Sequence, residues 1–160
     1  MKKEKGLTMA DAINFIEILR SIKSYTGLTP EGGLILLKNS ALIGRIVKEH
    51  VEEPVKELVD KLRTDEFVKL EEPAERIKAK KDTERTDEEK ATLKEYEDVS
   101  KKIVKEVNAT RDLILKDQVT IAPILKISEK DFSVLMMNEK NNDNITVIGF
   151  ELLYEHFVTK

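Results

Sequence analysis

The chain has two histidines, and each has a carboxylate nearby in the sequence. His50 precedes Glu53 by three residues, and Glu155 directly precedes His156. The three-residue spacing places His50 and Glu53 on one face of a helix, where both side chains would reach the same metal ion. One imidazole and one carboxylate are too few ligands for a zinc site. We therefore predict no metal site and interpret both histidines as solvated or packing residues.

Carboxylate pairs recur along the helical segments, and general acid–base catalysis uses such pairs. Glu49 with Glu52 and Glu95 with Asp98 are examples. The same pairs occur on any solvated helix, and the sequence marks no concave, dehydrated setting that would shift their pKa values. We predict that the chain is not an enzyme and that it has no catalytic residues.

Phosphate-loop and thiol chemistry are also disfavoured by the residues present. Gly32 and Gly33 lack the spacing of the glycine-rich loops that bind nucleotide phosphates. The chain has no cysteine, which excludes a thiolate nucleophile, a disulfide framework and a cysteine-ligated zinc. We predict no cofactor.

A local basic cluster lies near the middle of the chain, at Arg76, Lys78, Lys80 and Lys81. Such a cluster could contact nucleic-acid phosphates. It contains no aromatic residue, and carboxylates lie on both sides of it, which is more typical of a solvated helix end. We keep these four residues as possible partner contacts, with nucleic acid as the alternative to a protein partner.

Two long helical patterns surround this basic cluster. Apolar residues three and four positions apart form one stripe in each, which predicts two amphipathic helices. The first stripe consists of Ile43, Val47, Val51, Val55, Leu58 and Leu62, and the second of Leu93, Tyr96, Val99, Ile103, Val107, Thr110 and Ile114. We predict a mainly α fold built on a long antiparallel, coiled-coil-like helical hairpin, with residues 30–63 as its first arm and residues 86–117 as its second.

Local signals refine the two arms. Thr86 and Glu89 have the spacing of a capping box at the start of the second arm. Pro54 removes one hydrogen bond from the first arm, so we expect a kink or a break near His50. Residues 64–85 are dominated by charge and interrupted by Pro73. We expect them to form a mobile, partly disordered tip without one continuous helix.

An N-terminal helix is predicted over residues 8–26. Thr8 is placed to cap it, its apolar positions share one face, and Gly27 is placed to end it in a left-handed conformation. Thr29 and Pro30 then mark a new helix start. Residues 34–37 fit a buried strand or a helix, and their period, shared with the first stripe, favours the helix. Residues 33–46 are apolar nearly all round, so we expect them to be buried.

The C-terminal part, residues 118–160, is predicted to be a small α+β base. Residues 119–127 alternate as a short strand would, and Pro123 indicates either that it is an edge strand or that it ends there. Ser128 and Asp131 have the spacing of a helix cap, and Met136 and Met137 are interpreted as core-filling residues. Residues 138–144 read as a polar turn and residues 145–147 as extended chain, before a final helix.

Composition favours one soluble domain. The chain has 160 residues, a charged fraction of 37% and a net charge of −3, which is typical of solvated helix faces rather than of a surface for polyanions. No apolar run reaches the roughly 20 residues of a membrane span, and polar residues interrupt any signal-peptide core after the first lysines. We predict one domain over residues 1–160, a cytoplasmic location and no contact with membranes.

The order of these features resembles a family of small uncharacterised bacteriophage and prophage proteins. The features are an N-terminal helix, Lys38-Asn39 after an apolar turn, an acidic hairpin arm, a long charged tip, Val119-Thr120-Ile121, the segment from Ile127 to Phe132 and a terminal apolar helix. The resemblance implies a phage origin and supplies no catalytic residues. The hairpin also resembles the coiled-coil chaperone prefoldin superficially, but the extra N-terminal helix and the lack of a β-hairpin between the arms depart from that pattern.

These observations predict a non-enzymatic, phage-type structural or interaction protein that acts through helix packing and oligomerisation. Residues 34–46 and 150–157 supply more apolar surface than two helices cover, which favours a homo-oligomer or another protein as partner. We expect it in the host cell cytoplasm or the virion. The alternatives are a nucleic-acid-binding accessory protein that uses the basic cluster, and a small phage factor that binds and inhibits a host protein.

Overall fold

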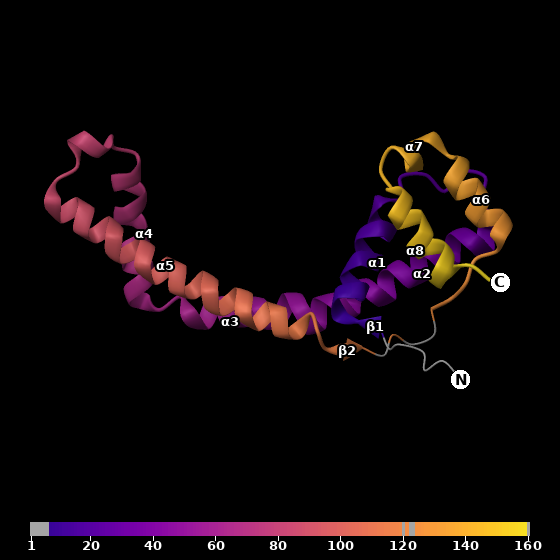
Figure 1. Cartoon of the computed structure of the whole chain (residues 1–160), viewed down its shortest axis with the longest axis horizontal. Helices are drawn as coiled ribbons and strands as arrows, with labels where there is room; N and C mark the ends of the chain where they lie inside the picture. Colours follow the sequence, from indigo (N-terminus) through magenta and orange to yellow (C-terminus); the bar gives the residue numbers. More distant parts are fainter. Residues whose placement is uncertain (1–6, 120, 122–123, 160) are drawn as a thin grey trace. The chain divides into compact units, whose positions relative to one another are not determined.

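The computed structural model describes residues 7–119, 121 and 124–159 and is mainly α-helical, as the sequence predicted. Its contacts divide the chain into two compact units (Figure 1). The base unit consists of Met1–His50 and Leu115–Lys160, and the arm unit consists of Val51–Ile114. A single domain over residues 1–160 requires that these two units unfold together, and this stays a prediction.

The base unit is made of helices joined by short extended segments. Its helices are α1 (Met9–Ser21), α2 (Pro30–Val47), α6 (Glu129–Met137), α7 (Glu139–Asn142) and α8 (Val147–Phe157). Strand β1 (Leu7–Thr8) pairs antiparallel with β2 (Gln118–Val119), and Ile127 makes an isolated parallel bridge to Val158. These pairings hold both ends of the described chain against the helices.

Side-chain caps define where the helices of the base unit begin. Thr8 and Asp11 form a reciprocal capping box at α1, Thr29 accepts a hydrogen bond from the Gly32 N–H at α2, and Thr146 caps α8. Each cap satisfies an N–H group that lacks a partner within its helix. The predicted helix over residues 34–37 is confirmed, because these residues lie inside α2.

The core of the base unit lies where α1, α2 and α8 meet. The Phe15 ring packs edge-on against the Phe157 ring, with centroids 5.3 Å apart. On the predicted apolar face of α1, Met9, Ala12, Ile16 and Leu19 are buried, and Phe15 is buried beside them. Other fully buried apolar side chains are Leu36, Ile43, Ile127, Leu135, Leu153 and Val158.

Several local predictions for the base unit are wrong. The N-terminal helix ends at Ser21, short of residue 26, and Gly27 adopts its positive φ of 87° in the following turn, where it caps no helix. Residues 138–144 contain the helical turn α7. Of residues 145–147, predicted to be extended, Thr146 has extended backbone as the cap of α8, but Val147 already belongs to that helix. The predicted strand over 119–127 is short, because β2 ends at Val119. Thr120, Ala122 and Pro123 lie outside the described residues.

The predicted burial of residues 33–46 is only partly correct. Leu36, Asn39 and Ile43 are buried on one face of α2, whereas Leu34 and Leu37 are about half exposed, at 51% and 54%. The helix α2 packs against α1, and α1 covers only one face of α2. The apolar residues on the other face therefore remain at the surface.

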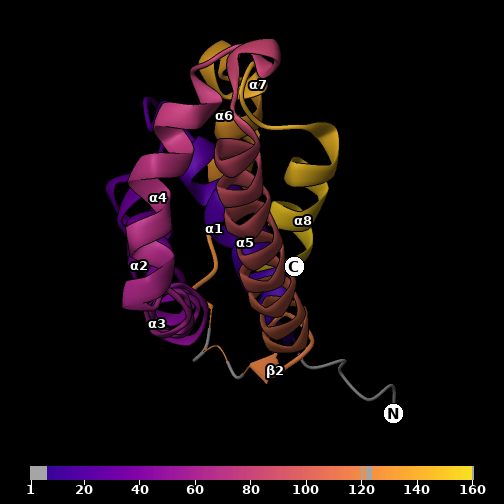
Figure 2. The ribbon, with the colours of Figure 1, turned by 90° about the vertical axis from the view of Figure 1, so that its left-hand side faces the viewer.

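The arm unit contains α3 (Glu53–Leu62), α4 (Asp65–Lys78), a 3₁₀ turn at Asp82–Glu84 and the long helix α5 (Asp87–Ile114). Both α3 and α4 pack along α5 (Figure 2). The expected break near Pro54 is confirmed: a π-helical turn, Lys48–Glu52, separates α2 from α3. Pro54 has no N–H to donate to the His50 carbonyl, so a regular α-helical bond is impossible at that point.

The prediction of a mobile, partly disordered tip over residues 64–85 is wrong. Helix α4 fills most of this segment and runs through Pro73. Thr64 caps the helix by accepting a hydrogen bond from the Phe67 N–H, and Phe67, Ala74 and Ile77 are buried. Proline costs one hydrogen bond, and the burial of these three side chains together with the cap offsets that cost.

The second stripe was predicted to pack on the whole first arm, but only the α3 part of that arm packs along α5; α4 takes the other place, and residues 30–47 belong to α2 of the base unit. None of the stripe's residues is fully buried. All seven side chains from Leu93 to Ile114 are half-buried. The Tyr96 ring stacks on the Phe67 ring of α4, with centroids 5.3 Å apart and planes 12° from parallel. The predicted capping box is confirmed, because Thr86 N–H donates to Glu89 and Glu89 N–H donates to Thr86.

Candidate functional site

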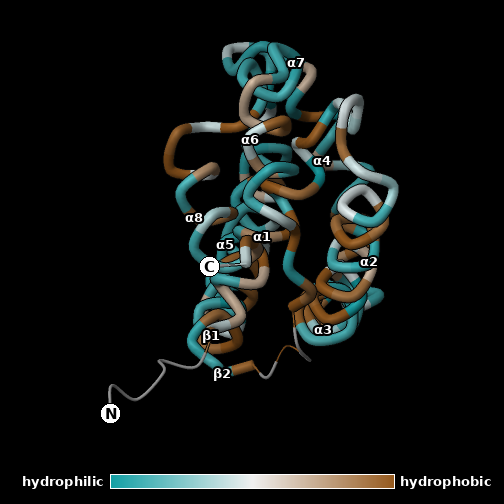
Figure 3. Tube along the Cα trace, turned by 90° about the vertical axis from the view of Figure 1, so that its right-hand side faces the viewer, coloured by the Kyte–Doolittle hydropathy of each residue, from teal (hydrophilic) through white to brown (hydrophobic). Residues whose placement is uncertain are grey.

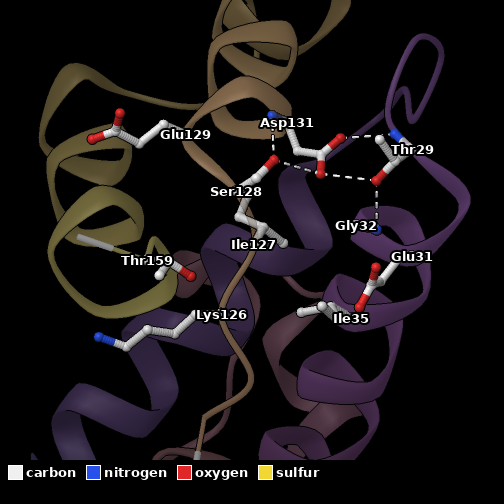
Figure 4. Close-up of a pocket in the computed structure, with 10 residues that line it drawn as sticks. All are labelled: Thr29, Glu31, Gly32, Ile35, Lys126, Ile127, Ser128, Glu129, Asp131 and Thr159. Atoms are coloured by element: carbon white, nitrogen blue, oxygen red, sulfur yellow. Dashed lines mark hydrogen bonds between the residues drawn. The ribbon is translucent and has the colours of Figure 1, made fainter.

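A cavity of about 670 Å³ in the base unit lies beside the N-termini of α2 and α6. Figure 4 shows the residues that line it. They are Thr29, Glu31, Gly32, Ile35, Lys126, Ile127, Ser128, Glu129, Asp131 and Thr159. A cavity with convergent polar groups is the place where a ligand or catalytic site is first sought.

Asp131 is the centre of the polar network in this cavity and is itself buried, with 4% of its surface exposed. Its Oδ1 accepts a hydrogen bond from the Thr29 N–H at 2.7 Å. Its Oδ2 accepts from the Thr29 hydroxyl and from the Ser128 hydroxyl, both at 2.9 Å. The carboxylate therefore joins the capping residue of α2 to the capping residue of α6 (Figure 4).

The surroundings of Asp131 favour its charged form. Burial by itself raises the pKa of this carboxyl group, but the hydrogen bonds from Thr29 and Ser128 outweigh burial, and the net pKa lies below the usual value. Two helix N-termini also place their partial positive charge beside it. Asp131 thus occupies the position that an anionic ligand takes at other helix N-termini.

This arrangement makes Asp131 a poor general base. Its oxygens already accept three hydrogen bonds, and its lowered pKa reduces its affinity for a proton. The charged side chains of Lys126 and Glu129 point away from it (Figure 4). Gly32 fits closely against the carboxylate, since a Cβ added there would lie 2.5 Å from Oδ2. The network is best explained as a structural link between α2 and α6.

Two buried asparagines act in a similar way. Asn39 donates to the Leu125 carbonyl at 2.7 Å and accepts from the Leu125 N–H at 3.1 Å, as a paired strand residue would. Asn141 accepts from the N–H groups of Lys23 and Ser24 and donates to the Ser24 carbonyl. Within the described part of the chain, every buried side-chain nitrogen or oxygen has a hydrogen-bond partner.

The two histidines lie in different surroundings. His50 is exposed in the π-helical turn. The half-buried ring of His156 lies 5.0 Å from the Phe15 ring, and its Nε2 lies 3.9 Å from Glu155. Among residues 7–119, 121 and 124–159, no group of three or more histidine, aspartate or glutamate side chains is arranged to hold a metal ion.

The basic cluster lies at the end of α4, and three of its four residues are engaged in ion pairs. Arg76 pairs with Glu72, Lys78 with Glu75 at 3.1 Å, and Lys80 with Glu89. The Lys78 ammonium also lies 4.6 Å from the centre of the Tyr96 ring. Lys81 is exposed. These pairs reduce the positive field that a phosphate backbone would meet.

A second surface of the base unit is apolar and open, contrary to the sequence interpretation. Met136 and Met137 at the end of α6 are 43% and 80% exposed, so they do not fill the core as predicted. At the start of α8, Val147 and Ile148 are 75% and 68% exposed. Figure 3 shows that the chain leading into α8 includes a hydrophobic stretch, drawn in brown. Tyr154 is 39% exposed.

Comparison with known proteins gives no family for this chain. No protein-family model, curated protein or solved structure matches it. Among the residues that the structure describes, no helix is both long enough and apolar enough to span a membrane.

Sequence reasoning found both caps of the Asp131 network but not their connection. The Ser128-to-Asp131 spacing and the Thr29-Pro30 pair each predict a helix start. The hydrogen bonds that join them cross 102 residues, and no local pattern encodes a contact of that separation. The exposure of Met137 was missed for the same reason, since it depends on which helices pack nearby.

Proposed function

We propose that this chain is a non-catalytic, phage-type interaction protein that acts through helix packing and assembles with a second copy of itself. The observation that carries the proposal is the incomplete burial of the stripe on α5. Its seven apolar or weakly polar side chains are half-buried although α3 and α4 already pack along the helix. Apolar side chains in this state gain free energy when a further helix covers them.

The spacing of the stripe supports coiled-coil-like packing. Within the stripe, Val107 and Ile114 lie seven residues apart, as do Tyr96, Ile103 and Thr110; the position seven residues after Leu93 is Ser100, next to Val99 of the stripe. This is the repeat of two helices that pack knobs into holes. Val104 and Leu113 flank the stripe and are 54% and 67% exposed, which widens the apolar surface beyond the width that two helices need.

Charges beside the stripe favour a second copy as the partner. Glu57 and Asp60 are exposed on α3, and Lys101 and Lys105 are exposed on α5. In a twofold dimer, the acidic α3 of one copy can lie against the basic part of α5 in the other, and both copies make the same contact. A cytoplasmic or virion location and the phage origin implied by the resemblance belong to the same proposal.

The solution mass tests this function. Light scattering coupled to size-exclusion chromatography is expected to give a dimer for the natural chain and a monomer for a Val104→Glu, Leu113→Glu double variant. Both positions are exposed, so the fold, checked by circular dichroism, is expected to remain. The matched control is Met137→Glu, which adds a carboxylate at an exposed apolar position of the base unit and should leave the dimer intact. A monomeric natural chain would refute self-association.

A further inference from the structure

The surface between α6 and α8 forms a groove of about 330 Å³, lined by side chains of both helices. Its residues are Glu129, Phe132, Ser133, Met136, Met137 and Tyr154. This volume is near the lower end of the range for ligand sites. It accommodates one or two large side chains of a partner more readily than a complete small-molecule ligand.

The floor of the groove is fixed by aromatic packing. The Phe132 ring lies 5.2 Å from the Tyr154 ring and 6.4 Å from the Phe150 ring, the latter edge-on. The Tyr154 hydroxyl donates to Glu129 at 3.1 Å, and this hydrogen bond raises the pKa of Tyr154. The tyrosine ring is therefore held in one orientation on the α8 side.

The other side of the groove is flexible and apolar. Met136 and Met137 have unbranched, polarisable side chains that can adapt to the shape of a partner. With 43% and 80% of their surfaces exposed, both can contact a partner directly. Methionines at the surface beside a rigid aromatic floor are the combination found at surfaces that bind amphipathic helices.

The charge at this groove is negative. Glu129 lines it, and α8 carries Glu151 and Glu155 but no lysine or arginine between Val147 and Phe157. Helix α6 adds one cation, the exposed Lys130, so the acidic groups still outnumber the basic ones. Glu151 lies three residues before Tyr154 and so shares its face of α8. A partner that brings lysine or arginine beside its apolar residues would complement this rim.

The groove favours a helix over an extended strand. Its two sides are helices, whose backbone N–H and C=O groups are bonded within each helix and offer no edge for strand pairing. The space between two packed helices instead accepts the side-chain ridge of a third. We propose that the α6–α8 groove binds a cationic amphipathic helix of another protein. This inference does not rest on the proposed self-association, which uses residues of the arm unit.

A fluorescence anisotropy titration tests the proposal with the full chain. The probe is a labelled synthetic helical peptide of leucine and lysine at amphipathic spacing, with a leucine and glutamate peptide of the same spacing as control. Saturable binding of the lysine peptide and much weaker binding of the glutamate peptide are expected. Equal binding of both peptides, or no binding of the lysine peptide, would overturn the proposal.

Two variants separate the apolar contribution from the charge. Met137→Asp is expected to weaken binding about tenfold, since the apolar contact that the methionine makes with the partner is lost. Attraction by charge alone predicts the opposite, because the substitution makes the groove more negative. Glu151→Lys is also expected to weaken binding. Val68→Asp, at an exposed apolar position of α4, should change the affinity less than about twofold, within the usual range for distant surface changes.

The same variants show whether something other than a helix of another protein occupies the groove. If Met137→Asp converts a dimer of the natural chain into a monomer, a second copy occupies the groove and the proposal of a foreign helix is wrong. If Met137→Asp and Val68→Asp lose affinity equally, the peptide binds at no defined site, and the proposal is also wrong. Loss of affinity at Met137 with an unchanged oligomeric state supports it.

Discussion

Asp131 and Thr29 form two hydrogen bonds, one from the threonine N–H at 2.7 Å and one from its hydroxyl at 2.9 Å, across 102 residues of sequence. The same threonine hydroxyl accepts from the Gly32 N–H at 3.0 Å and thereby caps α2. Because Ser128 also donates to this carboxylate, the first turns of α2 and α6 share one acceptor. A single ionised group thus positions two helices of the base unit.

Substitution of Asp131 by asparagine is expected to destabilise the base unit by about 1–3 kcal/mol. The side-chain NH2 group of asparagine is a hydrogen-bond donor, and it would lie against groups that are themselves donors. The pKa of Asp131 is lowered in the folded chain. Its contribution is therefore present above the unfolded pKa of about 3.9 and is lost as the pH falls through the lower folded value. Thermal unfolding at several pH values should show the difference between natural chain and variant shrinking below about pH 4. A constant difference would contradict the assignment.

Gly32 and Gly33 provide a matched pair in the first turns of α2. A Cβ at Gly32 would lie 2.5 Å from Asp131, whereas a Cβ at Gly33 would meet nothing within 4 Å. Gly32→Ala is therefore expected to destabilise the chain by about 1–3 kcal/mol. Gly33→Ala should stabilise it by about 0.5–1 kcal/mol, as alanine does inside helices. Denaturant unfolding of both variants measures this, and equal effects would be inconsistent with the close fit at Gly32.

Sequence reasoning predicted the features that depend on neighbouring residues. The capping box at Thr86 with Glu89 and the cap that Ser128 provides for the Asp131 N–H form where their spacing placed them. The break before Pro54 follows from one missing N–H group. Such features depend on atoms three or four residues apart, which the sequence shows directly.

Features that depend on distant contacts were missed. Pro73 was expected to interrupt the segment, but the burial of Phe67 and Ile77 in the arm unit keeps α4 continuous. Asn141 was read as part of a polar turn, yet it is fully buried and bonded to Ser24, 117 residues away. In each case tertiary packing outweighs the local preference.

Arg85 caps the C-terminal end of α4 from the following turn. Its guanidinium donates to the carbonyls of Ile77 at 3.1 Å, Lys78 at 3.3 Å and Lys80 at 2.9 Å. Arg85→Lys keeps the charge but cannot bridge three acceptors. We expect a loss of about 1–2 kcal/mol in the local stability of α4, measured as faster amide hydrogen exchange over residues 74–80. Lys81→Ala, at an exposed neighbour, is the control and should leave these exchange rates unchanged.

Tyr96 tests whether the two units unfold separately. Its ring stacks on Phe67 and lies beneath the Lys78 ammonium, so Tyr96→Ala removes two contacts between α4 and α5. Because Tyr96 is only half-buried, the expected loss is about 2 kcal/mol, below the range for a fully buried aromatic.

Hydrogen exchange should then become faster in α4 and in the first half of α5, and remain unchanged in α6 and α8, because the contacts of the arm unit lie mainly within it. Asp131→Asn is the reciprocal control, with faster exchange in α2 and α6 only. Equal acceleration in both units by either variant would instead support the single cooperative domain over residues 1–160 that the composition predicts.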